Sequence, residues 1–295
     1  FGCEIEMTGI TREQAAQAVA ALFGTTARQT RESRTYDPWE VIDNEGKKWR
    51  FVYDGSIHMT HRECRRQAAV HDSRYSVEMN SPKLEYSEMK KLQEVIRTLR
   101  HAGAVVNDSC GMHVHVDASK HTPRSLRNAL SIMYSKEDLI FKAIGAKPER
   151  ISQYCQYSRE NVVRTVRALS PRLTMEQLKQ AWYGVRDGSN DHYNWTRYYA
   201  LNLHSVFYHG TVEWRCFEST LHAGVVRANI TLALAISAQA INQTKTQSKK
   251  TPVTENPAFT FRTFLLRLGL VGEEYKNVRM HLLKNLPGDP AWRYD

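Results

Sequence analysis

One stretch of the chain, Thr211-Val-Glu-Trp-Arg-Cys-Phe217, alternates between two kinds of side chain. Val212, Trp214 and Cys216 fall on one side of an extended backbone, whereas Glu213 and Arg215 fall on the other. This two-residue period predicts a β-strand with one packed face. The carboxylate and guanidinium on the opposite face would form only a weak ion pair if that face were exposed to solvent.

The same alternation recurs in three other segments, and each time the polar face carries acidic or imidazole groups. These groups are Glu4 and Glu6 in residues 1–7, Glu78 in residues 75–80, and His113 and His115 in residues 110–117. Two glutamates on one strand face repel each other unless a cation lies between them; an exposed edge strand is the alternative. Two histidines at positions i and i+2 can bind a metal, or can form structural hydrogen bonds.

Helical patterns separate the predicted strands and supply apolar stripes that can cover one face of a sheet. Capping boxes begin at Thr11 and Thr174, Thr122 precedes a proline, and Ser87 precedes an apolar stripe. Residues 223–241 form an apolar segment that we interpret as the central core helix. The pattern predicts an α+β fold: a mainly antiparallel curved sheet with a concave active face and helices packed on its other side.

Other segments lack a clear period. We expect loops over residues 25–45 and 58–74, the second of them mobile, and a strand over residues 200–204. The whole chain, residues 1–295, is predicted to form a single catalytic domain with its motifs in residues 1–240. Residues 241–295 would add a mobile loop and closing helices.

Composition restricts the partners. The chain has 41% hydrophobic residues. We expect that no apolar run approaches the roughly 20 residues of a membrane span, and therefore expect no membrane partner. A net charge of +10 favours anionic ligands, but the basic residues do not gather in one stripe, so a nucleic-acid partner is not expected. Five cysteines without a CxxC pair favour buried thiols in a reducing compartment, hence a cytoplasmic location.

Several carboxylates and an imidazole on one sheet surface would repel each other without a cation. Mainly oxygen ligands with one imidazole suit Mg²⁺ or Mn²⁺ better than Zn²⁺, which favours nitrogen and sulfur. An arginine beside them supplies a planar group for binding phosphate. Metals and arginines acting on anionic oxygens are the working parts of phosphoryl transfer.

Five motifs, in this order, resemble the putative amidoligase family of the carboxylate–amine ligase superfamily, which has a glutamine synthetase-type catalytic domain. They are Phe-Gly-x-Glu-Ile-Glu at the start, Tyr-Asp-Gly-Ser at 53–56, Val-Glu-x-x-Ser-Pro at 77–82, Cys-Gly-Met-His-Val-His-Val-Asp at 110–117 and Thr-Val-Glu-Trp-Arg at 211–215. The resemblance covers roughly residues 1–240. The chain has no room for the extra N-terminal domain of the large synthetases, whose ring-shaped assembly is therefore not carried over.

The resemblance implies specific roles for these positions. The expected metal ligands are Glu4, Glu6, Glu78, His113 and Glu213. The expected catalytic residues are Arg215, Glu213 and His113, and the expected ATP- or phosphate-binding residues are Arg197, Arg215 and His115. We also expect Asp54, Ser56 and Asn202 to contact the substrate.

The implied reaction joins a small-molecule or peptide carboxylate to an amine. ATP, with Mg²⁺ or Mn²⁺ as cofactor, would phosphorylate the carboxylate, and the amine would then attack the acyl-phosphate. Two other classes stay open at this stage. One is a metal-dependent hydrolase that uses His113 and His115; the other is a basic nucleic-acid-binding protein without turnover.

Overall fold

The computed structural model describes residues 1–33, 35–63, 66–245, 247–252 and 254–293. The chain forms two compact units. The first contains residues 1–114 and 217–227, and the second contains residues 115–216 and those from 228 onward. The elements β8 (Gly111–Asp117), β10 (Thr211–Glu218) and α8 (Ala223–Asn242) contribute residues to both units. The structure is α+β with antiparallel strand pairing, as the sequence predicts.

The first unit contains a sheet whose strands follow one another in an order different from that in the sequence. The order is β2 (Ala27–Gln29), β3 (Trp39–Ile42), β4 (Lys48–Val52), β7 (Val77–Asn80), β1 (Gly2–Met7) and then β8. In the antiparallel β1–β7 pair, Glu6 lies opposite Glu78 and Glu4 lies opposite Asn80. The alternating residues Ile5 and Met79 are fully buried. The alternation therefore creates one apolar face and one face with a row of carboxylates.

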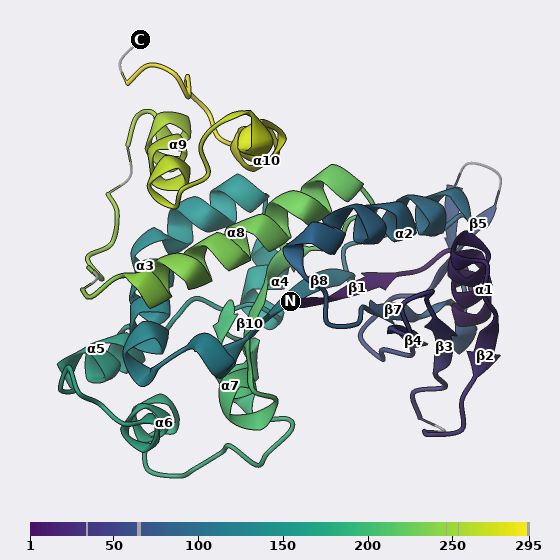
Figure 1. The fold of residues 1–295 in the computed structure, drawn as a ribbon, viewed down its shortest axis with the longest axis horizontal. Coiled ribbons are helices and arrows are strands. Elements are labelled where there is room, and N and C mark those ends of the chain that lie inside the picture. Colours follow the sequence, from purple (N-terminus) through teal and green to yellow (C-terminus); the bar gives the residue numbers. More distant parts are fainter. Residues whose placement is uncertain (34, 64–65, 246, 253, 294–295) are drawn as a thin grey trace. The chain divides into compact units, whose positions relative to one another are not determined.

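Two helices belong to the apolar side of the first unit (Figure 1). Helix α1 (Arg12–Phe23) begins with the predicted capping box at Thr11, ends at the left-handed Gly24, and packs on β2, β3 and β4. Helix α2 (Met89–His101) buries the predicted stripe. The position before α2 is Glu88, at the end of the short 3₁₀ turn η2 (Tyr86–Glu88), so the expectation of Ser87 as the cap was wrong.

Two segments expected to be loops contain strands. Residues 25–45 include β2 and β3, and residues 58–74 include a separate hairpin of β5 (Thr60–Glu63) and β6 (Arg66–Ala69). The 3₁₀ turn η1 (Ser73–Tyr75) follows that hairpin. Of these short strands, β2, β5 and β6 lack an apolar alternation and are defined by hydrogen bonds to their partner strands, which sequence periodicity does not detect.

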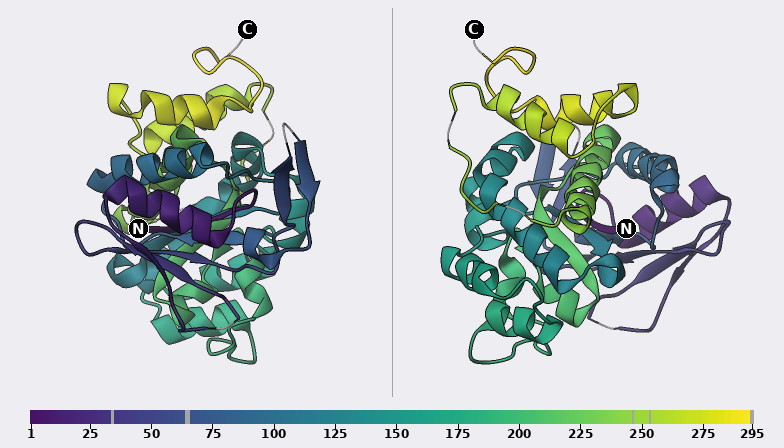
Figure 2. Two further views of the ribbon diagram at one scale, coloured as in Figure 1. Left: turned by 90° about the vertical axis from the view of Figure 1, so that its right-hand side faces the viewer. Right: turned by 60° about the vertical axis from the view of Figure 1, so that its left-hand side comes forward.

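The second unit is mainly helical. Its elements are α3 (Pro123–Ile144), α4 (Pro148–Gln153), α5 (Glu160–Ala168), α6 (Met175–Tyr183), α7 (His204–Tyr208), α9 (Pro257–Arg267), α10 (Lys276–Leu283), and the 3₁₀ turns η3 (Ala118–Lys120), η4 (Trp195–Tyr198) and η5 (Glu273–Tyr275). The predicted caps at Thr122 and Thr174 are present. Figure 2 shows α9 and α10 packed against each other.

The second unit contains the two-residue strand β9 and most of β10. The predicted strand over residues 200–204 is limited to β9 (Leu201–Asn202), because α7 begins at His204. β9 pairs antiparallel with β10, and Asn202 lies opposite Glu213. On the other side of β10, the amide of Ala118 after β8 donates to the carbonyl of Gly210 at 3.0 Å. Strand β10, which carries Glu213 and Arg215, thus lies between β8 and β9.

Helix α8 is the predicted core helix. By length and composition alone it could cross a membrane, with a mean hydropathy of 1.4, so the sequence-based statement that no segment approaches this length was wrong. In the structure, however, 61% of its most apolar window is buried. The Asn128 side chain on α3 also donates to the carbonyls of Ala240 and Gln243, at 3.1 and 2.8 Å. These features are typical of a core helix.

Candidate functional site

Three carboxylates converge in the first unit. Glu6, Asp54 and Glu78 each offer an oxygen atom, and these oxygens lie within 4.8 Å of one another. Glu6 and Glu78 meet because the β1–β7 register places them directly opposite each other. Asp54 reaches them from the turn that follows β4. A set of oxygen donors at this spacing fits a divalent cation such as Mg²⁺ or Mn²⁺.

The electrostatics of the cluster are unfavourable without a cation. Burial raises the pKa of Glu78 well above its ordinary value, and the negative charges of Glu4, Glu6 and Asp54 raise it further. A hydrogen bond with Asn80 opposes this shift but does not reverse it. A bound divalent cation would favour the ionised forms of these carboxyl groups.

The predicted histidine lies beside the same carboxylates. His113 is buried, with Nδ1 at 2.8 Å from Glu4 Oε2 and Nε2 at 3.9 Å from Glu6 Oε1. The backbone amide of Gly111 donates to Glu6 Oε2 at 2.6 Å. A carboxylate on one imidazole nitrogen is the arrangement that orients metal-binding histidines. The structure therefore brings together four of the predicted metal ligands: Glu4, Glu6, Glu78 and His113.

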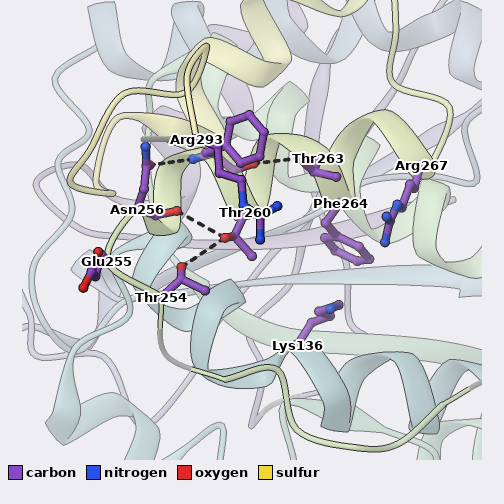
Figure 3. Close-up of a pocket in the computed structure, with 10 residues that line it drawn as sticks. Lys136, Thr254, Glu255, Asn256, Thr260, Thr263, Phe264, Arg267 and Arg293 are labelled. Carbon is purple, nitrogen blue, oxygen red and sulfur yellow. Dashed lines mark hydrogen bonds between the residues drawn. The ribbon is translucent and has the colours of Figure 1, made fainter. Parts of the chain in front are cut away.

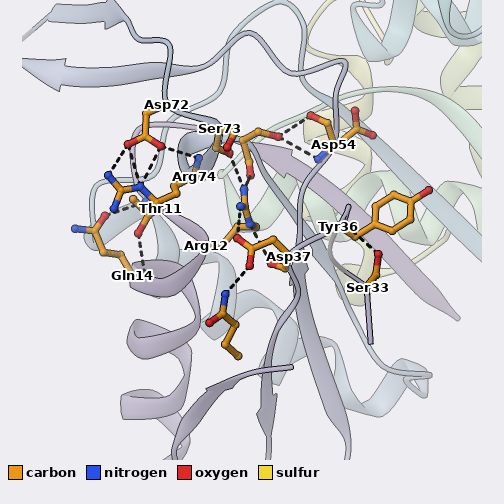
Figure 4. A network of polar contacts seen from close by, with 12 residues as sticks. Thr11, Arg12, Gln14, Ser33, Tyr36, Asp37, Asp54, Asp72, Ser73 and Arg74 are labelled. Atoms are coloured by element: carbon orange, nitrogen blue, oxygen red, sulfur yellow. Dashed lines mark hydrogen bonds and ion pairs between the residues drawn. The ribbon is translucent and has the colours of Figure 1, made fainter. Parts of the chain in front are cut away.

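A network of polar contacts fixes the position of Asp54 (Figure 4). The buried Arg12 donates from Nη1 to the carbonyls of Ser73 and Ser76, at 2.6 and 2.8 Å. Ser76 Oγ in turn donates to the Asp54 carbonyl at 2.6 Å and accepts from the Asp54 amide at 3.1 Å. The amide and hydroxyl of Ser56 both donate to Asp54 Oδ1, at 2.6 Å each.

This network gives Asp54 and Ser56 positions that the motif alone did not reveal. Both were expected to contact the substrate, and that role stays a prediction. The geometry adds Asp54 as a candidate metal ligand and Ser56 as the residue that orients it. No periodic pattern could have indicated this, since Asp54 lies in a turn rather than on a strand face.

In the second unit, Glu213 and Arg215 form an ion pair inside the protein. Arg215 Nη1 donates to Glu213 Oε1 at 2.6 Å, and Asn202 Nδ2 donates to Glu213 Oε2 at 2.7 Å. Glu213 is 4% exposed and Arg215 is 7% exposed. The possibility of a solvent-exposed, weak ion pair on this face is therefore wrong. A buried pair of this kind is costly to desolvate, so removing one partner has a large effect.

The ring of Tyr198 and the backbone carbonyl of Tyr154 lie near the guanidinium of Arg215. Arg215 Cζ lies 5.8 Å from the centre of the Tyr198 ring, and Arg197 Cζ lies 5.6 Å from the same centre. Arg215 Nε also donates to the carbonyl of Tyr154 at 3.5 Å. The two arginines that were expected to bind phosphate thus lie near one aromatic ring, an arrangement that suits cations. No pattern in the sequence singled out Tyr198 as a neighbour of both arginines.

The predicted phosphate-binding residue His115 belongs to a chain of hydroxyl contacts. His115 Nδ1 lies 3.0 Å from Thr211 Oγ1, which lies 2.8 Å from Ser205 Oγ. The amide of Ser205 donates to Asn202 Oδ1 at 3.3 Å. Asn202, expected to contact the substrate, therefore also links this chain to Glu213.

His204 is a candidate that the sequence did not single out. Its Nδ1 lies 2.5 Å from the hydroxyl oxygen of Tyr183, and its Nε2 has no hydrogen-bond partner among the described residues. Burial lowers the pKa of His204, and the positive charge of Arg197 lowers it further. A buried neutral imidazole with one uncommitted nitrogen can hold or transfer a proton.

The carboxylate cluster leads to a direct prediction. Replacing Asp54 with Asn should weaken Mn²⁺ binding by at least about 10-fold, because loss of a direct ligand should cost at least as much as loss of an orienting group. Isothermal calorimetry on wild type and variant measures this change. Asp72→Asn is the matched control, since Asp72 pairs with Arg74 in the first unit and lies outside the cluster. Equal Mn²⁺ affinities for wild type and Asp54→Asn would exclude Asp54 as a ligand.

Comparison with known proteins gives a family but no close relative. No curated protein and no solved structure matches the chain. Residues 1–237 match the family described as "Putative amidoligase enzyme". The match includes every predicted site residue from Glu4 to Arg215, and the name of the family indicates amide-forming ligases in general. Because the match covers most of the chain, the protein belongs to the putative amidoligase enzyme family.

Proposed function

We propose that this protein is an ATP-dependent carboxylate–amine ligase that forms an amide through an acyl-phosphate. The observation that carries this proposal is the convergence of Glu6, Asp54 and Glu78 in the first unit, with His113 and Glu4 beside them. Amide formation from a free carboxylate requires activation, and a cation site made of oxygen ligands suits activation by ATP. The family membership supports the ligase class.

The residues of the cluster fit a divalent metal. Glu6, Asp54 and Glu78 would hold Mg²⁺ or Mn²⁺ through oxygens, and His113 Nε2 would approach from the side of Glu6 while Glu4 fixes its ring. A divalent cation bound there would neutralise charge on a transferring phosphoryl group. The role of Glu213 as a further metal ligand stays a prediction.

Within the second unit, Arg215 and Arg197 are the guanidinium groups that we propose to bind phosphate. Arg215 would donate to phosphate oxygens as their charge develops, and Arg197 near the same tyrosine would assist. Glu213 and Asn202 would keep Arg215 in position. The sequence has no Walker-type GxxxxGK[ST] loop, so phosphate binding would depend on groups of this kind.

The proposed chemistry has two steps. A substrate carboxylate oxygen attacks the terminal phosphorus of ATP, which forms an acyl-phosphate and releases ADP. An amine then attacks the acyl carbon, orthophosphate leaves with the electron pair of the broken C–O bond, and the amine loses a proton. His204, neutral and buried near Arg197, is a candidate to accept that proton.

The proposal is tested by trapping the acyl-phosphate. The protein is incubated with Mg²⁺, ATP, a pool of carboxylates and hydroxylamine, and ADP, AMP and hydroxamate are measured together. We expect ADP and hydroxamate to rise in equal amounts, because hydroxylamine replaces the natural amine. Reactions that lack Mg²⁺ or carboxylate are the controls and should give neither product.

Other outcomes separate the alternatives. AMP and pyrophosphate as products would indicate an adenylating enzyme. Cleavage of a substrate without ATP would favour a metal-dependent hydrolase that uses His113 and His115. A salt-dependent shift of RNA or DNA without turnover would favour a nucleic-acid-binding protein. Any of these three results would contradict the ligase proposal.

A further inference from the structure

The second unit contains a cavity of about 530 Å³ that shares no residue with the sites described so far (Figure 3). Its walls come from α3, from residues 254–256, from α9 and from Arg293. Most of these wall residues follow residue 237, where the match to the amidoligase family ends. The volume falls within the range of about 300–1,000 Å³ that small-molecule sites occupy.

Positive charge dominates the cavity wall. Lys136, Arg267 and Arg293 line it, whereas Glu255 is the one acidic residue among the lining residues. Neither Lys136 nor Arg267 has an ion-pair partner in the described part of the chain. Burial lowers the pKa of Lys136, and the nearby charge of Arg267 lowers it further. An anion placed between these two side chains would relieve their repulsion.

A second cavity of about 230 Å³ shares part of this wall. Lys136, Phe264 and Arg267 line both cavities, and the second adds the amide side chains of Gln239 and Gln243. The Phe264 ring lies 5.8 Å from Lys136 Nζ. The pair of cations therefore borders both cavities, with an aromatic ring and amide groups beside it.

Hydrogen bonds, one of them from Lys136 itself, hold the wall in place. The amide of Thr251 donates to the Ser135 carbonyl at 2.9 Å, and Ser135 Oγ donates to the Lys249 carbonyl at 2.7 Å. Lys136 Nζ donates to Thr251 Oγ1 at 2.6 Å. Asn256 caps α9 and donates from Nδ2 to the carbonyls of residues 289 and 292, at 2.8 Å each. These contacts preorganise the segment that precedes α9.

We propose that this cavity binds a small organic anion. A carboxylate or phosphate group of the ligand lies against Lys136 and Arg267, and an apolar part of the ligand lies on the Phe264 ring. The threonine hydroxyls of α9, at Thr260 and Thr263, line the cavity and bind polar atoms of the remaining part. This inference does not depend on amide formation, because none of these residues belongs to the proposed catalytic site.

The test is calorimetric titration of the full chain, without ATP or metal, with citrate and separately with pyrophosphate. Arg267→Gln and Lys136→Met should each weaken binding by about 10-fold or more, as expected for loss of a charged hydrogen-bond partner. Arg262→Gln is the matched control, since Arg262 lies on the same helix but lines neither cavity. Arg267 is exposed, so its replacement should not affect folding.

The two probes distinguish the possible sources of the anion. Binding of citrate that depends on Lys136 and Arg267 would indicate a carboxylate ligand, and the same result with pyrophosphate would indicate a phosphate ligand. Either result supports the site. If neither probe binds at millimolar concentration, or if all three variants bind like wild type, the proposal is overturned. Since no turnover is measured, failure of the ligase assay would not affect this outcome.

Discussion

The Arg215→Lys variant should lose about 10²–10³-fold in turnover while it keeps most of the thermal stability of the wild type. Arg215 is buried beside Glu213, with an Nη1–Oε1 distance of 2.6 Å. A lysine can retain a contact with this carboxylate, so the buried charge stays paired. It cannot also present a second, parallel donor to a phosphate oxygen, because the ammonium lacks the planar fork of the guanidinium. Hydroxamate formation measures the loss of turnover, and thermal unfolding of the same samples measures the retained stability.

A purely structural role for Arg215 predicts different results. In that case Arg215 would serve only to form the buried ion pair with Glu213. Removing one partner, as in Arg215→Met, would cost about 3–5 kcal/mol because a buried carboxylate is left without its cation. Arg262→Lys on α9 is the control for general effects of the substitution. A large drop in melting temperature for Arg215→Lys, with full turnover, would refute a role in phosphate binding.

Local periodicity predicted the strands that carry the site and the helices that support them. β1, β7, β8 and β10 follow the alternating segments, and α1, α3 and α6 begin at their predicted caps. These features depend on residues that are close together in the sequence. Periodicity and capping therefore indicated both which side chains share a face and where each helix begins.

The pairing of strands that are far apart in the chain could not be predicted in the same way. Glu6 and Glu78 lie opposite each other because of the β1–β7 register, which links residues far apart in the chain. A shift by one residue would place Glu78 on the other face, and nothing in the local sequence fixes the register. The position of Asp54 likewise depends on Ser56 and on the contacts of Arg12 with Ser76. Glu6 and Glu78 could therefore be predicted as candidate metal ligands by residue type, whereas their geometry and the contribution of Asp54 could not.

The burial of Glu213 and Arg215 is a further feature that the sequence did not predict. The polar face of β10 carries Glu213 and Arg215, and such a pair is usually exposed. Here both side chains are buried, and Asn202 and Tyr154 complete their hydrogen bonds. Those partners come from β9 and from the end of α4, elements that the sequence predicted incompletely or not at all. When the residues that surround a side chain come from elements that were not predicted, the burial of that side chain cannot be predicted from its own strand.

Glu78→Gln should change activity and metal-free stability in opposite directions. As a direct ligand, Glu78 should contribute at least the 10–100-fold in metal affinity that orienting groups contribute, so turnover at limiting Mg²⁺ should fall by about that factor. The raised pKa of Glu78 means that the folded protein binds this proton more tightly than the unfolded chain does. Stability is therefore lost as the pH rises from below the ordinary pKa of glutamate through the raised value.

Glutamine carries no titrating proton, so the variant escapes this loss. In the absence of metal, Glu78→Gln should unfold at a higher temperature than wild type at neutral pH, and the difference should shrink as the pH falls below the ordinary pKa of glutamate. Adding Mn²⁺ should reverse the order, because metal binding stabilises only the protein that retains the ligand. Glu94→Gln, at an exposed position on α2, is the control. A metal-free variant less stable than wild type at neutral pH, with unchanged Mn²⁺ affinity, would show that Glu78 serves the fold and not a cation.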